Sequence, residues 1–398
     1  MTKLITGDIS AAADIIKSGG LVAVPTETVY GLAGNGLDLN SVERIYEVKG
    51  RPAVKPLALM VPGKEAMELY CEDIPYAAYA LADKFWPGPL TIVLKAKDVV
   101  PEIVRAGGET VGLRCPDHPM TLELLEKSGL PFAAPSANPS DLPSPKNAGK
   151  VMEYFDGVIE AVIDGGECGI GRESTLIDMS CKPYRILRQG ALSETEIAAA
   201  LVDNMSIVGI TGPTGCGKTT ALSVLRDFGA LVLDCDAVYH ELLESNSQLT
   251  AELDQAFPGT VKDGVLDRKA MGAVVFNDPA ALGKLNAISH RHIALEINKR
   301  LENWAMSGGR LAALDAIELI SSGISECCDV LIGVLSDKNL RAERIMARDG
   351  LDETAAWLRI NAQRPDDYFK ENCHHIIYNN STEEEFRDSV VNLLTEVL

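Results

Sequence analysis

The stretch GITGPTGCGKTT at residues 209–220 constrains the fold of this chain more than any other. Gly212, Gly217, Lys218 and Thr219 satisfy the spacing GxxxxGK[ST]. In such a loop the backbone N–H groups point at phosphate oxygens, and the N-terminus of the following helix adds positive charge. The apolar run SIVGIT precedes the loop, and we expect a helix to begin near Lys218. A strand before and a helix after argue against a chance match.

The rest of the C-terminal half alternates apolar runs with helical stretches. Four further buried strands are expected, at 229–236, 310–319, 329–337 and 375–380. This alternation is typical of a parallel sheet flanked by helices on both faces. The sequence therefore predicts an α/β domain with a phosphate-binding loop here.

Several side chains near the loop suit phosphoryl transfer. Lys218 would reach the β- and γ-phosphates of ATP, and the Thr219 hydroxyl would bind Mg²⁺. Asp234 and Asp236 lie where the second strand is expected to end. One of them could accept the proton of an acceptor hydroxyl, and the alternative is that both cap the next helix. Cys216, inside the loop, is read as a small tolerated residue rather than a redox switch.

Other polar clusters have two interpretations. Arg341, Arg344 and Arg348 fall on one helical face. They form either a solvated surface or a lid that closes over phosphates. The cluster Cys373–His375 is the one metal-like group in the sequence, and without a second ligand pair packing is favoured over metal binding.

The N-terminal half alternates less regularly. Strands are expected at 21–26, 57–61, 90–96, 110–115, 158–164 and 174–179, and helices at 8–18, 40–49 and 75–85. A last helix should begin at Ser193, where SETE forms a Ser-x-x-Glu capping box. We place the domain boundary just before the kinase strand, which predicts domains 1–203 and 204–398. The first is expected to be a twisted α/β sheet.

Composition restricts the partners of the 398-residue chain. Its formal net charge of −20 disfavours direct binding of tRNA or DNA. No apolar run is long enough to span a membrane, and the N-terminus shows no signal peptide. Nine cysteines without a CxxC motif suit a reduced compartment, so we expect a cytoplasmic protein.

The blocks GITGPTGCGKTT, VLDCDAVYHELL and HHIIYNN occur in an order that resembles dephospho-CoA kinases over roughly 205–398. That family transfers a phosphoryl group from ATP to the ribose 3′-hydroxyl of dephospho-CoA. The resemblance implies that Asp236 is the general base and that Lys218 is catalytic. The implied ATP contacts are Gly215, Cys216, Gly217, Lys218, Thr219, Thr220, Arg344 and Arg348. The implied acceptor contacts are Asp236, Arg268 and His290, with Arg291 where the family has proline.

The blocks VPTETVYGLAGN, KGRP, WPGPLT, VGLRCPDHP and PFAAPSANPS resemble the YrdC/TsaC threonylcarbamoyl-AMP synthases over 1–200. That family combines L-threonine, bicarbonate and ATP, and its product serves threonylcarbamoyladenosine formation in tRNA. The Lys-x-Arg…Ser-x-Asn signature is Lys49, Arg51…Ser136, Asn138, with Lys49 and Arg51 as catalytic candidates. The implied ATP contacts are Arg51, Lys55, Thr110, Ser136, Asn138, Ser144 and Arg188. The implied threonine contacts are Thr28, Arg114 and Ser174, and Met60 stands where many members have histidine.

Together the two resemblances imply a bifunctional enzyme whose substrates are L-threonine, bicarbonate, dephospho-CoA and ATP, with Mg²⁺. A transient partner would come from the tRNA threonylcarbamoyl transfer machinery. Two alternatives stay open: an RNA-binding N-terminal half, and a C-terminal kinase for another small hydroxyl acceptor such as a nucleoside. A third is that one half is an inactive scaffold.

Overall fold

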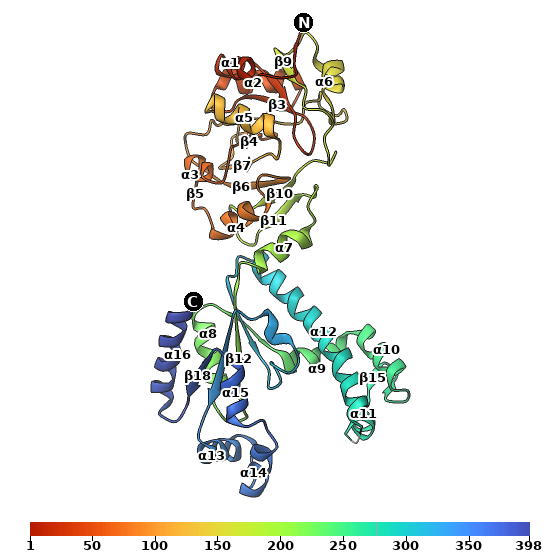
Figure 1. The fold of residues 1–398 in the computed structure, drawn as a ribbon, viewed down its shortest axis with the longest axis vertical. Helices are drawn as coiled ribbons and strands as arrows, with labels where there is room; N and C mark the ends of the chain where they lie inside the picture. The colour runs from red at the N-terminus through yellow and green to blue at the C-terminus, as the bar shows by residue number, and fades with distance from the viewer. Residues whose placement is uncertain (277) are drawn as a thin grey trace. The chain divides into compact units, whose positions relative to one another are not determined.

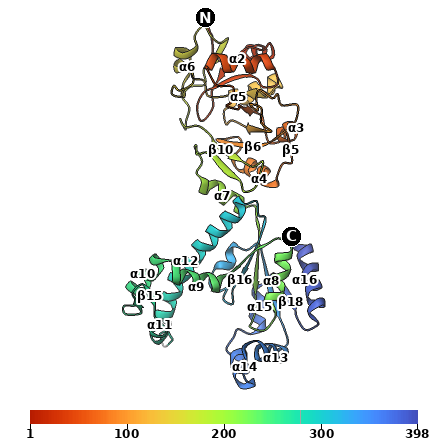
Figure 2. The ribbon, with the colours of Figure 1, turned by 180° about the vertical axis from the view of Figure 1, so that it is seen from behind.

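The computed structural model describes residues 1–276 and 278–398, and the chain in it forms two compact units (Figures 1 and 2). The first unit comprises Met1–Asn204 with Met306–Gly308, and the second comprises Met205–Ala305 with Gly309–Leu398. None of the helices in the described part of the chain is long and apolar enough to cross a membrane.

The first unit is built on an 11-stranded sheet in the order β1-β9-β2-β3-β8-β4-β7-β6-β10-β11, with β5 paired to β6. Its strands are β1 (Lys3–Ile5), β2 (Val22–Val24), β3 (Gly31–Asn35), β4 (Ala58–Met60), β5 (Cys71–Glu72), β6 (Leu90–Ala96), β7 (Thr110–Arg114), β8 (Phe132–Ala133), β9 (Ala161–Ile163), β10 (Thr175–Asp178) and β11 (Arg185–Arg188). Its helices are α1 (Ser10–Lys17), α2 (Leu39–Lys49), α3 (Ala66–Tyr70), α4 (Tyr76–Phe85), α5 (Pro119–Ser128), α6 (Ala148–Phe155) and α7 (Glu194–Val202).

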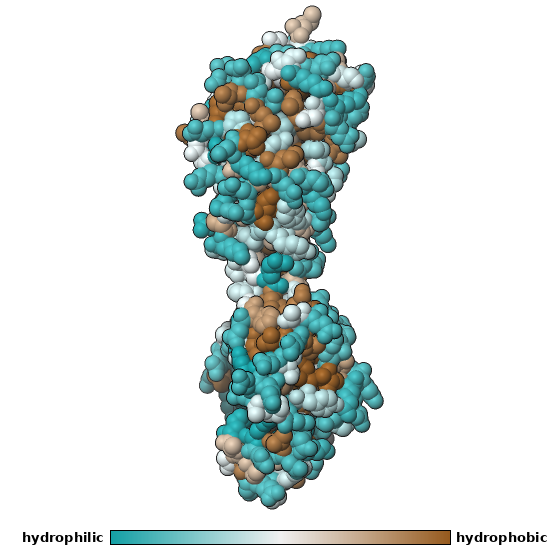
Figure 3. Space-filling model, turned by 90° about the vertical axis from the view of Figure 1, so that its left-hand side faces the viewer, coloured by the Kyte–Doolittle hydropathy of each residue, from teal (hydrophilic) through white to brown (hydrophobic). Residues whose placement is uncertain are grey.

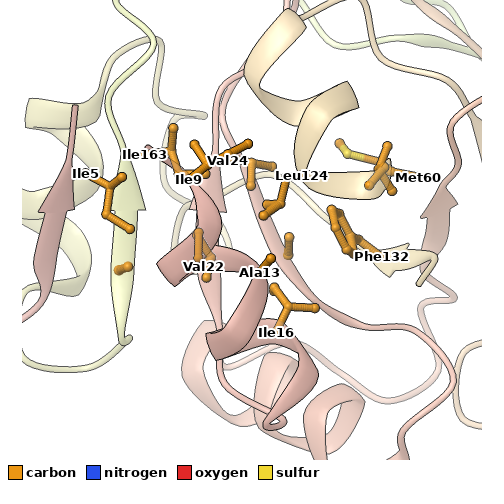
Figure 4. Packing of buried hydrophobic residues seen from close by; sticks show 14 residues of the cluster. Ile5, Ile9, Ala13, Ile16, Val22, Val24, Met60, Leu124, Phe132 and Ile163 are labelled. Atoms are coloured by element: carbon orange, nitrogen blue, oxygen red, sulfur yellow. The ribbon is translucent and has the colours of Figure 1, made fainter. Parts of the chain in front are cut away.

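A hydrophobic core joins one part of this sheet to helices α1 and α5. Figure 4 shows Ile16 and Ala13 of α1 near Leu124 of α5 and Phe132 of β8. Met60, at the end of β4, belongs to the same core and is 4% exposed. The core therefore extends to Met60, the residue that stands where many of the resembling synthases have a histidine.

The second unit carries a five-stranded sheet in the order β13-β16-β12-β17-β18, in which every pair is parallel. Its strands are β12 (Ser206–Thr211), β13 (Leu231–Asp234), β16 (Leu311–Asp315), β17 (Val330–Leu335) and β18 (His375–Tyr378), with a separate hairpin of β14 (Val261–Lys262) and β15 (Val265–Leu266). Its helices are α8 (Lys218–Asp227), α9 (Cys235–Ser245), α10 (Ser247–Ala256), α11 (Arg268–Val275), α12 (Pro279–Met306), α13 (Lys338–Asp349), α14 (Glu353–Asn361), α15 (Asp366–Asn372) and α16 (Glu383–Val397), with a short 3₁₀ helix at Ile324–Cys327.

Helices α8 and α16 pack together beside the sheet, and α10 and α11 lie with the β14–β15 hairpin near the far end of the long helix α12 (Figure 1). The central strand β12 has neighbours on both sides, β16 and β17. The chain runs from β12 to β13 on the β16 side, and from the neighbouring β17 to β18 on the other side, so the connections diverge between β12 and β17. In parallel sheets ligands bind at the carboxyl edge at such a switch point, which is where residues 212–217 lie.

The structure confirms many expected elements. Strand β12 and the start of α8 at Lys218 agree with the prediction, and α7 has the capping box between Ser193 and Glu196. The expected strand 229–236 was too long, because Asp234 ends β13 and caps α9. The expected strand 310–319 likewise stops at Asp315. Strands β1, β3, β8 and β11, which have two to five residues, were not expected. Helices α5 and α6 were not expected either, although their buried residues follow a helical spacing.

The face of the molecule drawn in Figure 3 is largely hydrophilic. Figure 3 shows one face, on which brown apolar residues form patches among teal hydrophilic ones. Exposed apolar side chains in small groups are normal for globular proteins.

Candidate functional sites

The Gly-rich loop of the second unit surrounds a pocket of about 350 Å³. Gly217 caps α8 with φ of 99°, and Gly212 has φ of 141°; side chains other than glycine rarely adopt such values. The lining residues come from the loop, the strand ends and two later helices. They are Pro213, Thr214, Gly215, Cys216, Gly217, Lys218, Thr219, Asp234, Asp236, Asp315, Ile317, Arg344, Arg348 and Arg359. The pocket thus combines main-chain N–H groups, cations and carboxylates.

Lys218 and Asp315 both line this pocket. The Nζ of Lys218 donates to the Gly212 carbonyl at 3.0 Å, so the ammonium lies along the loop. Oδ1 of Asp315 is buried and has no hydrogen-bond partner among the described residues. Burial raises the pKa of Asp315 to about 6, against the opposing effect of Lys218. An unpartnered buried carboxylate oxygen is suited to a bound cation or hydroxyl group.

Asp234 and Asp236 have different roles in the local structure. Oδ1 of Asp234 accepts from the N–H groups of Asp236 at 2.9 Å and Ala237 at 3.0 Å, so Asp234 caps α9. Asp236 lies in the first turn of α9 and lines the pocket. Partial loss of hydration raises the pKa of Asp236, and the nearby Asp234 carboxylate adds to this rise. Asp234 therefore caps the helix, and Asp236 lines the pocket without a capping role.

The three arginines expected on one face of a helix separate in the structure. Arg344 and Arg348 of α13 line the pocket, together with Arg359 of α14. Asp349 binds Arg348 at 2.7 Å and Arg359 at 2.6 Å, so one carboxylate holds two cations at the pocket wall. Arg341 is only 2% exposed. It belongs to neither a solvated face nor a lid, because its guanidinium donates to the Thr214 carbonyl.

Of the residues expected to contact the acceptor, Asp236 lines the pocket, whereas Arg268 and His290 lie outside its lining. Arg268 contacts Nδ1 of His240 at 3.0 Å, and His240 follows Asp236 by one turn of α9. Burial lowers the pKa of His290. The Glu318 carboxylate raises the pKa of both His290 and Asp236, which places these groups in one electrostatic neighbourhood. Thr220 also lies outside the lining, in the first turn of α8.

The first unit contains its own pocket of about 540 Å³, a size typical of small-molecule sites. Four cations line it, namely Arg51, Lys55, Arg114 and Arg188. The other expected residues in its wall are Thr110, Ser136 and Ser174. Four other expected residues lie outside the wall but bind residues that form it. Thr28 binds Arg114, Lys49 and Asn138 bind Ser136, and Ser144 binds Glu173.

Arg114 is fixed at one end of this pocket. Its NH2 donates to Oε1 of Glu27 at 2.8 Å and to Oγ1 of Thr28 at 2.7 Å, and its Nε donates to the Gly88 carbonyl at 3.3 Å. The Arg114 and Glu27 side chains are 9% and 12% exposed. Arg114 also lines the pocket, and the planar fork of a guanidinium suits a carboxylate ligand.

A second polar group holds Arg188. Its NH1 pairs with Glu173 at 2.6 Å, and its NH2 donates to Oγ of Ser174 at 3.0 Å. Glu173 also accepts from Ser144 at 3.2 Å, which connects Ser144 to the pocket wall. Ser174 exchanges a hydrogen bond of 2.8 Å with Thr91. The serines and the arginine thus form one network.

Lys49 lies behind the wall, where it is 3% exposed. Its Nζ donates to the main-chain oxygens of Ser136 and Asn138. The amide of Asn138 donates to the carbonyls of Pro139 and Leu142 at 2.9 and 2.7 Å. Burial, together with the nearby Arg51 charge, lowers the pKa of Lys49 to about 8. The contacts place Lys49 and Asn138 so that they shape the loop that carries Ser136.

Several polar residues of these sites were absent from the sequence prediction as site residues, among them four charged ones. Asp315 and Arg359 line the kinase-side pocket, and Glu27 and Glu173 hold the arginines of the other. Asp315 gave a usable signal, because it ends a buried strand as Asp234 does. No such signal marks Arg359, Glu27 or Glu173 in the sequence, because each pairs with a residue that is not adjacent to it in the sequence.

Two family models match the chain. The Sua5–YciO–YrdC model, described as telomere recombination, covers residues 14–190, and the dephospho-CoA kinase model covers residues 206–385. The threonylcarbamoyl-AMP synthase of Pyrococcus abyssi is 51% identical over 189 residues, covering 48% of this chain and 56% of that protein. The chain spans little more than half the length of such longer synthases.

Two relatives are covered over most of their own length. A Mycobacterium tuberculosis protein, whose assignment as a threonylcarbamoyl-AMP synthase is provisional, is 34% identical over 203 residues, covering 50% of this chain and 93% of the relative. The dephospho-CoA kinase of Paramagnetospirillum magneticum is 38% identical over 162 residues, covering 41% of this chain and 76% of that kinase. The chain therefore belongs to two families, the Sua5–YciO–YrdC family through its first unit and the dephospho-CoA kinase family through its second.

Proposed function

We propose that this chain is a bifunctional enzyme. Residues 1–203 form threonylcarbamoyl-AMP from L-threonine, bicarbonate and ATP, and residues 204–398 phosphorylate dephospho-CoA to coenzyme A. Membership of the two families supports the proposal. The observation that carries it is that each unit has a separate pocket lined by cations, with a phosphate-binding loop at only one of them.

In the kinase, the loop and Lys218 hold the ATP phosphates. Asp236 accepts the proton of the ribose 3′-hydroxyl as that oxygen forms its bond to the γ-phosphorus and ADP leaves. Arg344 and Arg348 neutralise charge on the transferring group. Arg268 and His290 contact the acceptor outside the pocket lining.

The residues around Lys218 fit a magnesium ion. Mg²⁺ prefers carboxylate and hydroxyl oxygens and keeps several waters and phosphate oxygens as ligands. No three His, Cys, Asp or Glu groups form a complete metal cage in the described chain, so ATP would supply part of the coordination. Asp315, with its unpartnered oxygen, and the Thr219 hydroxyl would hold the ion. When bound it would supply positive charge that neutralises the nucleotide phosphates.

In the synthase, Arg114 binds the threonine carboxylate, next to Thr28 and Ser174. Arg51, Lys55 and Arg188 hold the triphosphate, with Thr110, Ser136 and Ser144 nearby. Threonine carbamate, formed from the amine and bicarbonate, is an anion that attacks the anionic α-phosphate. The cations screen this repulsion and stabilise the phosphoryl oxygens while pyrophosphate leaves. Lys49 and Asn138 keep the Ser136 loop in place.

Incubation of the full chain with ATP, Mg²⁺, labelled bicarbonate, threonine and dephospho-CoA tests the proposal. Mass spectrometry should identify threonylcarbamoyl-AMP, pyrophosphate, coenzyme A and ADP. A panel of nucleosides offered in place of dephospho-CoA separates this kinase from one that uses another acceptor. Turnover of a nucleoside, with none of dephospho-CoA, would disprove the kinase assignment.

The synthase product is consumed in tRNA modification, so we infer a transient partner from the threonylcarbamoyl transfer machinery. The formal charge of −20 makes direct tRNA binding unfavourable. Binding of labelled tRNA to the full chain, measured across a salt titration, should be weak. Tight binding with a steep salt dependence would favour an RNA-binding first unit instead.

A further inference from the structure

Side chains from later segments bind three consecutive main-chain carbonyls of the phosphate loop. The carbonyl of Thr214 accepts from Nε of Arg341 at 3.0 Å. That of Gly215 accepts from NH1 of Arg344 at 3.4 Å, and that of Cys216 accepts from Nδ2 of Asn379 at 3.0 Å. The donors come from α13 and from the residue that follows β18. The outer edge of the loop is therefore held by hydrogen bonds from residues that follow it by at least 127 positions in the sequence.

Gln363, between α14 and α15, adds a second set of bonds to the same loop. Its Oε1 accepts from the Thr214 N–H at 3.0 Å and from NH2 of Arg341 at 2.9 Å. Its Nε2 donates to Oγ1 of Thr214 at 2.6 Å. The N–H, carbonyl and hydroxyl of Thr214 all have partners in this way. Because Thr214 and Arg341 are buried, a lost bond leaves an unsatisfied polar group.

Asn379 occupies the space next to the last glycine of the loop. A Cβ atom built on Gly217 would lie 2.0 Å from Nδ2 of Asn379. Asn379 also accepts from Arg344 through its main-chain oxygen and its Oδ1, each at 3.2 Å. Its amide is thus oriented with nitrogen toward the loop and oxygen toward the arginine. The glycine at position 217 is needed both for its φ and for this close contact.

The geometry of a trans peptide connects these outer bonds to the nucleotide site. In each peptide the C=O and the following N–H point in opposite directions. Bonds that hold the carbonyls of residues 214–216 outward therefore turn the N–H groups of residues 215–217 to the opposite edge, and these residues line the pocket. The Cys216 N–H also makes a long turn contact to the Pro213 carbonyl at 3.4 Å. Arg341, Gln363 and Asn379 do not line the pocket.

We propose that Arg341, Gln363 and Asn379 are positioning residues that hold the loop ready for ATP from its outer side. The inference rests on the proposed kinase function only for the identity of the acceptor. An unsupported loop must order itself when ATP binds, which weakens nucleotide binding. Loss of the support raises the KM for ATP more than the KM for dephospho-CoA.

Asn379→Asp is the first test, since it keeps the shape and the oxygen that Arg344 uses but removes the donor to Cys216. We expect the KM for ATP to rise about tenfold, the loss of one charged or buried hydrogen bond, with the KM for dephospho-CoA within about twofold of wild type. Asn380→Asp is the matched control. Oδ1 of Asn380 only accepts, from the Asp337 N–H at 2.8 Å, so this variant should behave as wild type.

Gln363→Leu and Gln363→Glu form a second pair. Leucine removes every bond to Thr214, whereas glutamate still accepts from the Thr214 N–H and from Arg341, and the Thr214 hydroxyl can then donate. We expect weaker ATP use in Gln363→Leu and at least partial recovery in Gln363→Glu. An equal loss in both variants, or in Asn379→Asp and Asn380→Asp, would overturn the proposal.

Hydrogen exchange of the full chain gives a readout that needs no acceptor. Peptides that cover residues 209–225 should exchange faster in Asn379→Asp than in Asn380→Asp, and ATP should protect them less. If wild type shows ATP protection of the loop but makes no coenzyme A, the kinase proposal fails and the positioning inference stands. If the loop of Asn379→Asp exchanges as in wild type, with an unchanged KM for ATP, the positioning inference fails.

Discussion

At the scale of single residues, Asp234 and Asp236 show how similar side chains divide two tasks. They are separated by one residue, and each carries a carboxylate at the edge of the same pocket. Asp234 uses its oxygen to cap α9, whereas Asp236 faces the pocket with a raised pKa. The higher pKa makes Asp236 the stronger proton acceptor once it is ionised.

Asp236→Asn is therefore expected to lower the kcat of coenzyme A formation by about 10²- to 10⁴-fold, the usual contribution of a general base. The KM for ATP should change by less than about twofold, because Asp236 does not hold the nucleotide. Asp234→Asn is the control, since asparagine caps helices as well as aspartate does. A comparable loss of kcat in both variants would contradict the assignment of the base to Asp236.

Lys49 predicts a dependence of stability on pH. Burial lowers its pKa to about 8 in the folded chain, from 10.5. Between these values the unfolded chain binds more protons, so the stability contributed by Lys49 rises with pH through this window and is lost as pH falls through about 8. Relative to Lys49→Met, wild type should gain up to about 1.4 kcal/mol for each pH unit within the window.

Calorimetry of the full chain at about pH 8 and about pH 10 measures the difference in free energy of unfolding between wild type and Lys49→Met. The relevant signal is the unfolding transition whose temperature changes on substitution. Lys55→Met is the control, because Lys55 is exposed at the pocket mouth. A difference between wild type and Lys49→Met that stays constant over this range would refute the linkage.

At the scale of elements, interactions at helix ends fix where the helices begin. Helix α7 begins with a reciprocal capping box, in which Ser193 accepts from the Glu196 N–H at 3.2 Å and Glu196 accepts from the Ser193 N–H at 2.7 Å. This element was expected from four letters of sequence, because a capping box is a local interaction.

Ser193→Ala should lower the free energy of unfolding of the first unit by about 1 kcal/mol, the usual cost of losing an N-cap oxygen. The corresponding transition should fall by about 2–4 °C in calorimetry for a unit of this size. Ser193→Thr keeps the hydroxyl and should recover most of the loss. Equal melting temperatures for the alanine and threonine variants would show that the hydroxyl does not stabilise this helix.

The ends of α13 and α14 illustrate a less predictable case. Arg348 and Arg359 lie in different helices, and Asp349 pairs with both. The helical periodicity places Arg341 and Arg348 on one face, but the packing of α13 against the loop buries Arg341. Periodicity predicts the face of the helix on which a side chain lies. Whether that face is exposed to solvent or buried depends on the segments that pack against it in the folded domain.

At the scale of the whole molecule, two units with separate pockets predict separable activities. Lys218→Ala should lower coenzyme A formation by about 10²- to 10³-fold, as the removal of one preorganised charge-stabilising donor does. Threonine-dependent release of pyrophosphate from ATP should stay at the wild-type rate, because Lys218 contributes only to the second unit.

Arg51→Ala is the reciprocal change. It should reduce threonine-dependent pyrophosphate release by about tenfold to a hundredfold, the value of a charged hydrogen bond, with coenzyme A formation unchanged. Both activities are measured on the same preparation. If either substitution removed both of them, the two sites would not be independent, and if wild type had only one activity the other unit would be a scaffold.

Features that depend on residues close together in the sequence could be predicted from the sequence. The loop at 209–220, the strand before it and the capping box at Ser193 depend on residues a few positions apart, so spacing alone specifies them. The positions of Arg51, Arg114 and Arg188 in one pocket wall came from resemblance, since no local pattern brings three distant arginines together.

The sequence by itself determined the two family memberships, the phosphate loop and the segments of the second unit that form its parallel strands. Only the tertiary structure decided that Arg341, Gln363 and Asn379 bind the outside of that loop, that Asp315 leaves an oxygen unpartnered, and that Lys49 lies behind a pocket wall. The physical reason is burial. A polar side chain far along the chain must find a partner once folding removes its water, and which partner it finds depends on strands and helices that meet only in the folded domain.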